Sequence, residues 1–215
     1  RDAGVQRFTP TGARDGRVGL LFFPGALVDP VAYAPLARTV AEAGFDVVIL
    51  ELPRRGAFGG ANDPALHARA RALLGDAAAP DRWVVGGHSR GGVVASQLAA
   101  ERPAGLGGLV LVGTTHPRDV DLSDVVVPVT KVVGTRDGLA RPAGVEANRH
   151  LLPGATRWVW IEGANHSQFG WYGFQPGDRF ATISAERQRA LTTDAIIETL
   201  RAAARPGAAA APSAS

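Results

Sequence analysis

The chain contains no cysteine and no methionine, and Lys131 is its only lysine. Without cysteine, a disulfide, a thiol nucleophile and a thiolate metal site are all excluded. Without an initiating methionine, Arg1 is expected to be a trimmed or processed start, after an upstream signal peptide or anchor. No apolar run approaches the roughly 20 residues of a membrane-spanning helix. We therefore expect a soluble domain without a membrane span.

The positive charge comes almost wholly from arginine, with 23 basic and 20 acidic residues and a net charge of +3. The arginines are scattered among acidic residues, so binding to nucleic acid is disfavoured and codon bias explains them better. The sequence has no His-x-x-x-His pair and no GxxxxGK[ST] phosphate loop. We accordingly expect no metal and no cofactor.

Apolar runs alternate with segments of helical periodicity along the 215 residues, a length that suits one domain. About six strands are predicted, over residues 18–23, 45–50, 83–86, 109–112, 126–133 and 158–161. Helices are predicted over residues 33–43, 64–74, 93–100 and 186–203. This alternation predicts an α/β fold with a mostly parallel sheet and helices on both faces. The domain is expected to span residues 1–204, followed by a disordered, low-complexity tail over residues 205–215.

The most informative motif is GHSRGG at residues 87–92, between a strand-like run and a helix-like run. Glycine two residues before and two residues after Ser89 is the spacing of a nucleophile elbow. The turn is so tight that side chains at those two positions would collide with the packed strand and helix. Chance matches occur in a chain with 27 glycines, but the strand and helix context favours Ser89 as a nucleophile.

A serine hydroxyl needs a base to take its proton, and the base needs an orienting carboxylate. Asp137 and His166 each follow a predicted strand, and the chain order Ser, Asp, His is that of α/β-hydrolases. Alternatively, Asp137 is a turn residue before a glycine, and His166 is an ordinary loop histidine. The rival acids, which also follow a strand, are Asp119, Asp121 and Asp124.

An oxyanion would be stabilised by backbone N–H groups, which we predict at Ala26 and Arg90. Residues 113–125 are too few for a lid domain, so an open, shallow site is expected. The candidate substrate-pocket residues are Leu27, His88, Phe169, Trp171 and Tyr172. For His88 a structural role is favoured over a catalytic one, and the aromatic residues after His166 could equally pack the loop onto the sheet.

Five motifs together resemble a known family: FPGALVDP at 23–30, YAPL at 33–36, GHSRGG at 87–92, GTRDGLA at 134–140 and EGANHSQFGWYG at 162–173, which continues into QPGD at 175–178. From about residue 18 to 200 the chain resembles a small bacterial α/β-hydrolase of the dienelactone-hydrolase-like type (Abhydrolase_5). The resemblance implies the α/β-hydrolase fold and Ser89, Asp137 and His166 as the catalytic triad. Relatives often carry an N-terminal anchor, which suggests an extracytoplasmic domain; the compartment is otherwise unassigned.

The chain departs from that pattern at Arg90, where leucine is common, at Ala26, where glycine is common, and in residues 51–63. The expected activity is cofactor-independent hydrolysis of a small carboxylic ester or lactone through an acyl-enzyme on Ser89. A lyase or perhydrolase on the same fold is an alternative, because fold does not fix function. A catalytically silent binding module is another, although its signature would be a broken triad. The sequence assigns neither the physiological substrate nor the oligomeric state.

Overall fold

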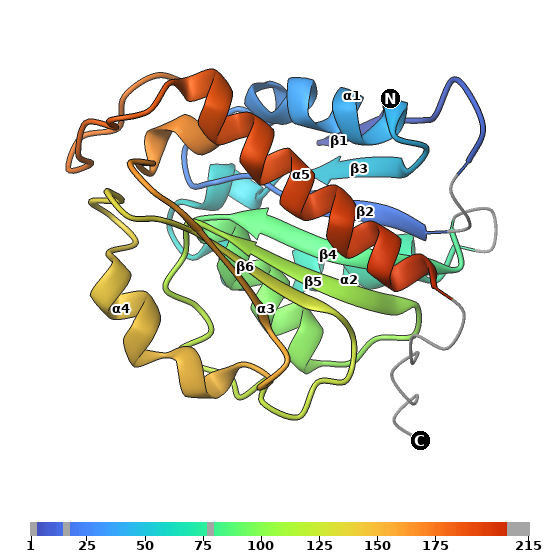
Figure 1. Cartoon of the computed structure of the whole chain (residues 1–215). Coiled ribbons are helices and arrows are strands. Elements are labelled where there is room, and N and C mark those ends of the chain that lie inside the picture. The colour runs from blue at the N-terminus through green and yellow to red at the C-terminus, as the bar shows by residue number, and fades with distance from the viewer. Residues whose placement is uncertain (1–3, 15–17, 77–79, 206–215) are drawn as a thin grey trace.

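The computed structural model describes residues 4–14, 18–76 and 80–205. Seven strands form one sheet in the order β1-β3-β2-β4-β5-β6-β7, and only the β1–β3 pair is antiparallel (Figure 1). The strands are β1 (Val5–Phe8), β2 (Val18–Phe23), β3 (Asp46–Leu50), β4 (Arg82–His88), β5 (Leu106–Val112), β6 (Val129–Gly134) and β7 (Arg157–Ile161). The predicted α/β class with a mostly parallel sheet is confirmed. Residues 206–215, nearly all of the predicted tail, lie outside the described residues.

The strand count of about six was too low, because the edge strand β1 was missed. None of its four residues is fully buried, so the segment lacks the apolar run or alternation that marks a strand. The predicted strand at 126–133 also begins late, at Val129. Val126 is 62% exposed and Pro128 has no N–H to donate to a neighbouring strand, so the chain enters the sheet only after them.

Five α-helices accompany the sheet among the described residues: α1 (Ala34–Glu42), α2 (Pro64–Leu74), α3 (Arg90–Ala100), α4 (Pro142–Ala147) and α5 (Ala185–Ala204). Short 3₁₀ helices lie at Pro30–Tyr33, Pro53–Gly56, Gly60–Asn62, Arg149–Leu151 and Ser167–Phe169. Helices α2 and α5 begin where a side chain caps the first turn, Asp63 and Ser184 respectively. Helix α4 was not predicted, because six residues are too few to show a helical period.

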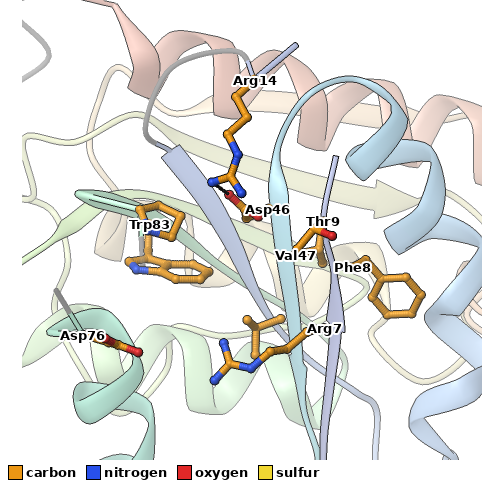
Figure 2. Close-up of a pocket in the computed structure, with 10 residues that line it drawn as sticks. Arg7, Phe8, Thr9, Arg14, Asp46, Val47, Asp76 and Trp83 are labelled. Carbon is orange, nitrogen blue, oxygen red and sulfur yellow. Dashed lines mark hydrogen bonds and ion pairs between the residues drawn. The ribbon is translucent and has the colours of Figure 1, made fainter. Parts of the chain in front are cut away.

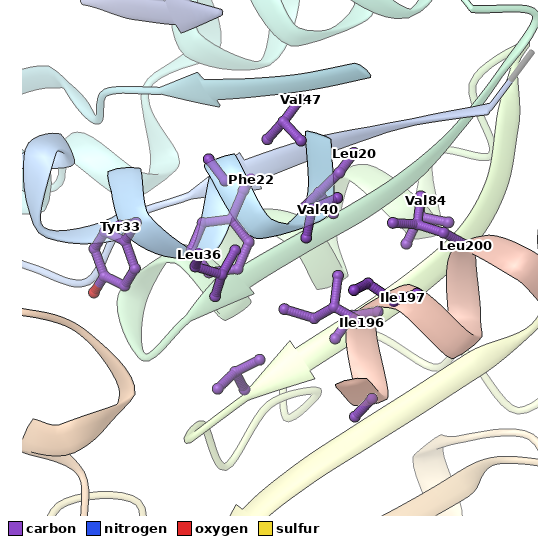
Figure 3. Packing of buried hydrophobic residues seen from close by; sticks show 14 of the residues in the cluster. Leu20, Phe22, Tyr33, Leu36, Val40, Val47, Val84, Ile196, Ile197 and Leu200 are labelled. Carbon is purple, nitrogen blue, oxygen red and sulfur yellow. The ribbon is translucent and has the colours of Figure 1, made fainter. Parts of the chain in front are cut away.

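The sheet divides the core into two apolar layers. Leu20 and Phe22 of β2 point to the layer under α1 and α5, whereas Leu21 and Phe23 point to the layer under α2 and α3. Figures 1 and 3 show α1 and α5 on one face, with Leu36, Val40, Ile196 and Leu200 meeting the strands. This period of two, with both faces covered, explains why β2 is apolar at every position except Gly19.

The connections that matter for function follow the carboxyl ends of the parallel strands. Ser89 follows β4, Asp137 lies three residues after β6, and His166 lies five residues after β7. Residues 113–128, between β5 and β6, contain no helix or strand and therefore no lid domain. Across the described part of the chain, no helix combines the length and apolarity needed to cross a membrane.

Candidate active site

Ser89 occupies the single-residue turn between β4 and α3. Its backbone has φ 53° and ψ −115°, a conformation that costs a non-glycine residue about 1–3 kcal/mol. A Cβ on Gly87 would clash with the carbonyl of Gly91, and a Cβ on Gly91 would lie 2.6 Å from the carbonyl oxygen of Pro24. Both glycines of the motif are therefore required by close backbone packing, and the turn holds the Ser89 side chain half-buried at the end of the sheet.

Asp137 and His166 form a buried pair. The Nδ1 atom of His166 lies 2.8 Å from Oδ2 of Asp137, and both side chains are almost fully excluded from solvent. Oδ1 of Asp137 accepts hydrogen bonds from the N–H groups of Leu139 and Ala140, at 2.9 and 2.6 Å. Since a carboxylate only accepts, Nδ1 carries the proton and Nε2 is left as the free acceptor.

Nε2 of His166 is buried and makes no hydrogen bond to any described residue. The hydrogen bond to Ser89 that an assembled triad requires is thus not formed in this conformation. Such bonds are often loose before substrate binds and tighten in the complex. The open, shallow site stays a prediction, because Ser89 is half-buried and Nε2 is covered.

The three rival acids are engaged elsewhere. Asp119 lies 3.4 Å from Nε2 of His116, and Asp121 accepts a hydrogen bond of 2.9 Å from the backbone of Ser123. Asp124 forms an ion pair with Arg102. Of the four candidate carboxylates, Asp137 is the one that the fold brings to His166.

His88 was offered as a pocket residue, but it is only 1% exposed and lies beneath the site. Its ring centroid is 4.5 Å from that of His166. Its Nδ1 lies 2.8 Å from the Tyr33 hydroxyl, which in turn accepts a hydrogen bond of 3.1 Å from the N–H of Gly25. Burial, reinforced by His166, lowers the pKa of His88 well below its usual value, so the ring is neutral and Nδ1 accepts a hydrogen bond from the Tyr33 hydroxyl.

Tyr33 therefore ties the strand that carries Ser89 to the loop after β2. Burial raises the pKa of Tyr33, which keeps its hydroxyl protonated as the donor to His88. This role of Tyr33 has no signal in the sequence, because a tyrosine at the start of a helix does not reveal a distant hydrogen-bond partner.

The predicted oxyanion donors lie on adjoining segments. Gly91, one residue after Arg90, packs against the carbonyl of Pro24, two residues before Ala26. The backbone N–H of Leu27 is already used, since it donates to the carbonyl of Arg55 at 2.7 Å. Convergence of the Ala26 and Arg90 N–H groups on one oxyanion stays a prediction.

The other pocket candidates divide into packed and exposed side chains. Phe169 is 2% exposed and its ring centroid lies 5.4 Å from that of His88, while Tyr172 is half-buried against the same ring at 6.2 Å. Trp171 is 42% exposed beneath the guanidinium of Arg189, and Leu27 is 72% exposed. Leu27 is thus free to meet a ligand, whereas Trp171 is stacked against Arg189 and Phe169 mainly supports His88.

A separate cavity of about 300 Å³ lies at the opposite end of the sheet (Figure 2). Trp83, at the start of β4, lines it together with Arg7, Arg14 and Asp46, and the last two form an ion pair of 2.8 Å. The indole N–H of Trp83 is buried and donates to none of the residues that the structure describes. The cavity is remote from Ser89. Within the described residues, no three His, Asp or Glu side chains gather as a metal site.

Comparison with known proteins agrees with the fold described above. Residues 19–190 match the model of the family described as "Alpha/beta hydrolase family". Similar solved structures include TT1662 from Thermus thermophilus (18% identity, TM-score 0.66, 94% of each chain covered) and the butyrate-bound esterase Est2 from Thermogutta terrifontis (16%, 0.61, 90% of this chain and 88% of that one). A monoacylglycerol lipase from Paleococcus ferrophilus is also similar (17%, 0.65, 93% and 99%).

No curated protein matches the chain at a significant level. The solved structures, all below 20% identity, show the shared fold alone. The family match covers most of the sequence and both segments that carry the Asp137–His166 pair. The chain therefore belongs to the alpha/beta hydrolase family.

Proposed function

We propose that this protein is a serine hydrolase that cleaves a carboxylic ester or lactone through an acyl-enzyme on Ser89. The observation that carries the proposal is the buried hydrogen bond of 2.8 Å between Asp137 and His166, on loops beside the strained Ser89 turn. A buried carboxylate at Nδ1 stabilises the imidazolium that forms when Nε2 takes a proton. An imidazole oriented in this way by a buried carboxylate is what a serine nucleophile needs as its base.

In the first half-reaction, Nε2 of His166 takes the Ser89 hydroxyl proton while Oγ bonds to the carbonyl carbon. The ester C–O bond then breaks, and His166 returns the proton to the leaving alcohol. In the second half-reaction, His166 deprotonates water, which attacks the acyl carbon. The bond from that carbon to Oγ breaks, and Ser89 regains the proton as the acid leaves. The N–H groups of Ala26 and Arg90 are proposed to stabilise the oxyanion in both halves.

Two features favour esters with an apolar group as substrates. Two similar structures are described as an esterase bound to butyrate and as a monoacylglycerol lipase. In this chain, Leu27 and Trp171 expose apolar side chains on the loops after β2 and after His166. An acyl or alkyl group covering them would gain about 25 cal/mol for each Å² of apolar surface removed from water. We assign both to the substrate pocket, with His88, Phe169 and Tyr172 packed behind them.

The test is hydrolysis of a p-nitrophenyl ester series of increasing acyl length, by the wild-type protein and by Ser89→Ala. We expect the variant to lose on the order of 10⁴- to 10⁶-fold in kcat, because the covalent step is lost. Ser123→Ala, at an exposed loop serine, is the matched control and should retain full activity. Equal activity of wild type and Ser89→Ala would refute the mechanism.

The unformed hydrogen bond between His166 and Ser89 favours one second candidate, a catalytically silent binding module on the same fold. Labelling with a fluorophosphonate, which reacts only with an activated serine, separates the two. An adduct on Ser89 that is absent from Ser89→Ala supports the hydrolase. Absence of an adduct together with inertness toward every ester supports the silent module.

A further inference from the structure

Asp178 lies in the loop between the 3₁₀ helix Ser167–Phe169 and α5, far along the chain from Asp137. Its half-buried carboxylate accepts five hydrogen bonds. Oδ1 accepts from the backbone N–H groups of Gly138 (3.0 Å), His166 (3.2 Å) and Arg179 (2.8 Å), and Oδ2 accepts from the N–H (2.8 Å) and the hydroxyl (2.7 Å) of Ser167. With five donors around one half-buried carboxylate, the Asp178 side chain is held in a single, well-defined position.

Four of these five donors belong to the two loops that carry the proposed acid and base. Gly138 directly follows Asp137, and Ser167 directly follows His166, whose own N–H also donates. The loops are in contact here, since a Cβ on Gly138 would lie 2.8 Å from Cα of Asp178. Asp178 therefore joins the two loops immediately after Asp137 and His166.

Other contacts also hold these loops. Oδ1 of Asp137 accepts from the two N–H groups at 139 and 140, and the Tyr172 hydroxyl donates to the carbonyl of His166 at 3.4 Å. The N–H of Arg136 donates to the carbonyl of Ala164 at 2.8 Å, before either functional residue. Asn165 exchanges two hydrogen bonds with the side chain of Gln188, which anchors it to α5. Asp178 adds to these contacts the hydrogen bonds that tie the backbone directly after Asp137 to the backbone at and after His166.

The chemistry of Asp178 suits this task. Burial tends to raise the pKa of Asp178, but the hydrogen bonds from Ser167, Gly138 and Arg179 outweigh burial and hold the pKa below its usual value. The group is therefore an anion at neutral pH, and hydrogen bonds to an anion are stronger than those between neutral groups. An asparagine would offer one acceptor atom and would turn its NH₂ group toward N–H donors.

We propose that Asp178 is the positioning residue that holds His166 in register with Asp137. The proposal rests on the proposed function, in which that pair performs the proton transfers. Asp178 does not touch the reacting atoms; it fixes the backbone on which the imidazole and the carboxylate are mounted. A loosened pair spends less time in the reactive geometry, and a misplacement of about 1 Å can cost on the order of 100-fold in rate.

The first test is Asp178→Asn, which keeps the shape of the side chain and replaces one of its two acceptor oxygens by an NH₂ group. We expect kcat for the best ester to fall about 10- to 100-fold, with KM within twofold of wild type, because positioning and not substrate contact is lost. Glu162→Gln is the matched control, since Glu162 is an exposed carboxylate on the same segment between β7 and His166. The control should keep both constants within twofold.

The second test reads the pair directly by proton NMR, through the low-field resonance of the His166 Nδ1–H that is shared with Asp137. Asp137→Asn assigns this resonance by abolishing it. We expect Asp178→Asn to shift or broaden it, and Ser167→Ala, which removes one donor, to produce a smaller shift and a several-fold loss of kcat. Should Asp178→Asn fail to fold, Ser167→Ala decides by the same two readouts.

An unchanged resonance in the folded variants would overturn the proposal, and so would a loss of activity expressed only in KM. Failure of the proposed function has a different signature. In that case the wild-type protein is inert toward esters and fluorophosphonate, while the resonance still reports whether Asp178 positions His166.

Discussion

Two histidines lie side by side at the end of the sheet, but their Nδ1 atoms have different partners. His88 and His166 are each 1% exposed, with ring centroids 4.5 Å apart. Nδ1 of His166 faces a carboxylate, which stabilises a protonated ring, whereas Nδ1 of His88 accepts a hydrogen bond from the phenol of Tyr33. Burial lowers the pKa of His88, and no anion offsets it. Because the two rings are equally buried, the partner at Nδ1 distinguishes them. A carboxylate supports His166 as the proposed base, whereas burial without such a carboxylate keeps His88 neutral.

Removing the anion from His166 should have the largest effect, because it makes the two histidines alike. In Asp137→Asn the amide can force the wrong tautomer and cannot stabilise the imidazolium, so kcat should fall about 10⁴-fold with little change in KM. Steady-state ester hydrolysis measures both constants. Asp119→Asn, beside His116, is the control and should retain wild-type kinetics. If Asp137→Asn kept a tenth of the activity, His166 would not depend on this carboxylate.

Some residues of the candidate site can be predicted from the sequence alone, and others cannot. Ser89, Asp137 and His166 could be predicted because each follows a strand, and the carboxyl ends of parallel strands meet at one edge. The glycines at 87 and 91 are fixed by local clashes and so carry a local signal.

The supports of the site carry no such signal. The partners Tyr33 and His88 are 55 residues apart, and Asp178 and Gly138 are 40 apart. Those contacts depend on how loops close in three dimensions, and a phenol or carboxylate in a loop looks the same whether it is solvated or bound. The edge strand β1 was missed for a related reason: it forms by pairing with β3, and its own four residues show no strand pattern.

Breaking the support under His88 should have an intermediate effect. Tyr33→Phe leaves the N–H of Gly25 and Nδ1 of His88 without a partner in a buried site, so the free energy of unfolding should fall by about 1–3 kcal/mol. Because Gly25 precedes Ala26, kcat should also fall several-fold through a looser oxyanion loop. Urea denaturation and ester kinetics measure the two effects.

A double-mutant cycle gives the control for that experiment. If Tyr33 acts through His88, the losses of stability in Tyr33→Phe and His88→Gln should not add, with a coupling of about 0.5–3 kcal/mol. Strict additivity would show that the hydrogen bond between the two side chains contributes nothing, and that Tyr33 stabilises the fold by packing alone.

Lys131 is a third buried basic side chain, and we expect its substitution to have the smallest effect on activity. It is 1% exposed on β6, its ammonium donates to the backbone carbonyl of His116, and no ion pair with a described carboxylate is found. Burial lowers its pKa to about 7, against 10.5 for an exposed lysine. Between these values the unfolded chain binds more protons than the folded protein, so stability should rise with pH from about 7 toward 10.5.

Lys131→Met keeps the volume of the side chain and abolishes this titration. We expect the urea midpoint of the wild-type protein to rise between pH 7 and 9.5, while that of Lys131→Met stays comparatively flat. The stability of the variant relative to wild type should therefore be greatest near pH 7. Burial lowers the pKa of His116 to about 4, so its own titration affects stability only below about 6.5, outside this range. Parallel pH profiles for the two proteins would mean that Lys131 stays charged when buried. The carbonyl of His116 would then suffice to hold a cation without a carboxylate, contrary to the rule drawn from the two histidines.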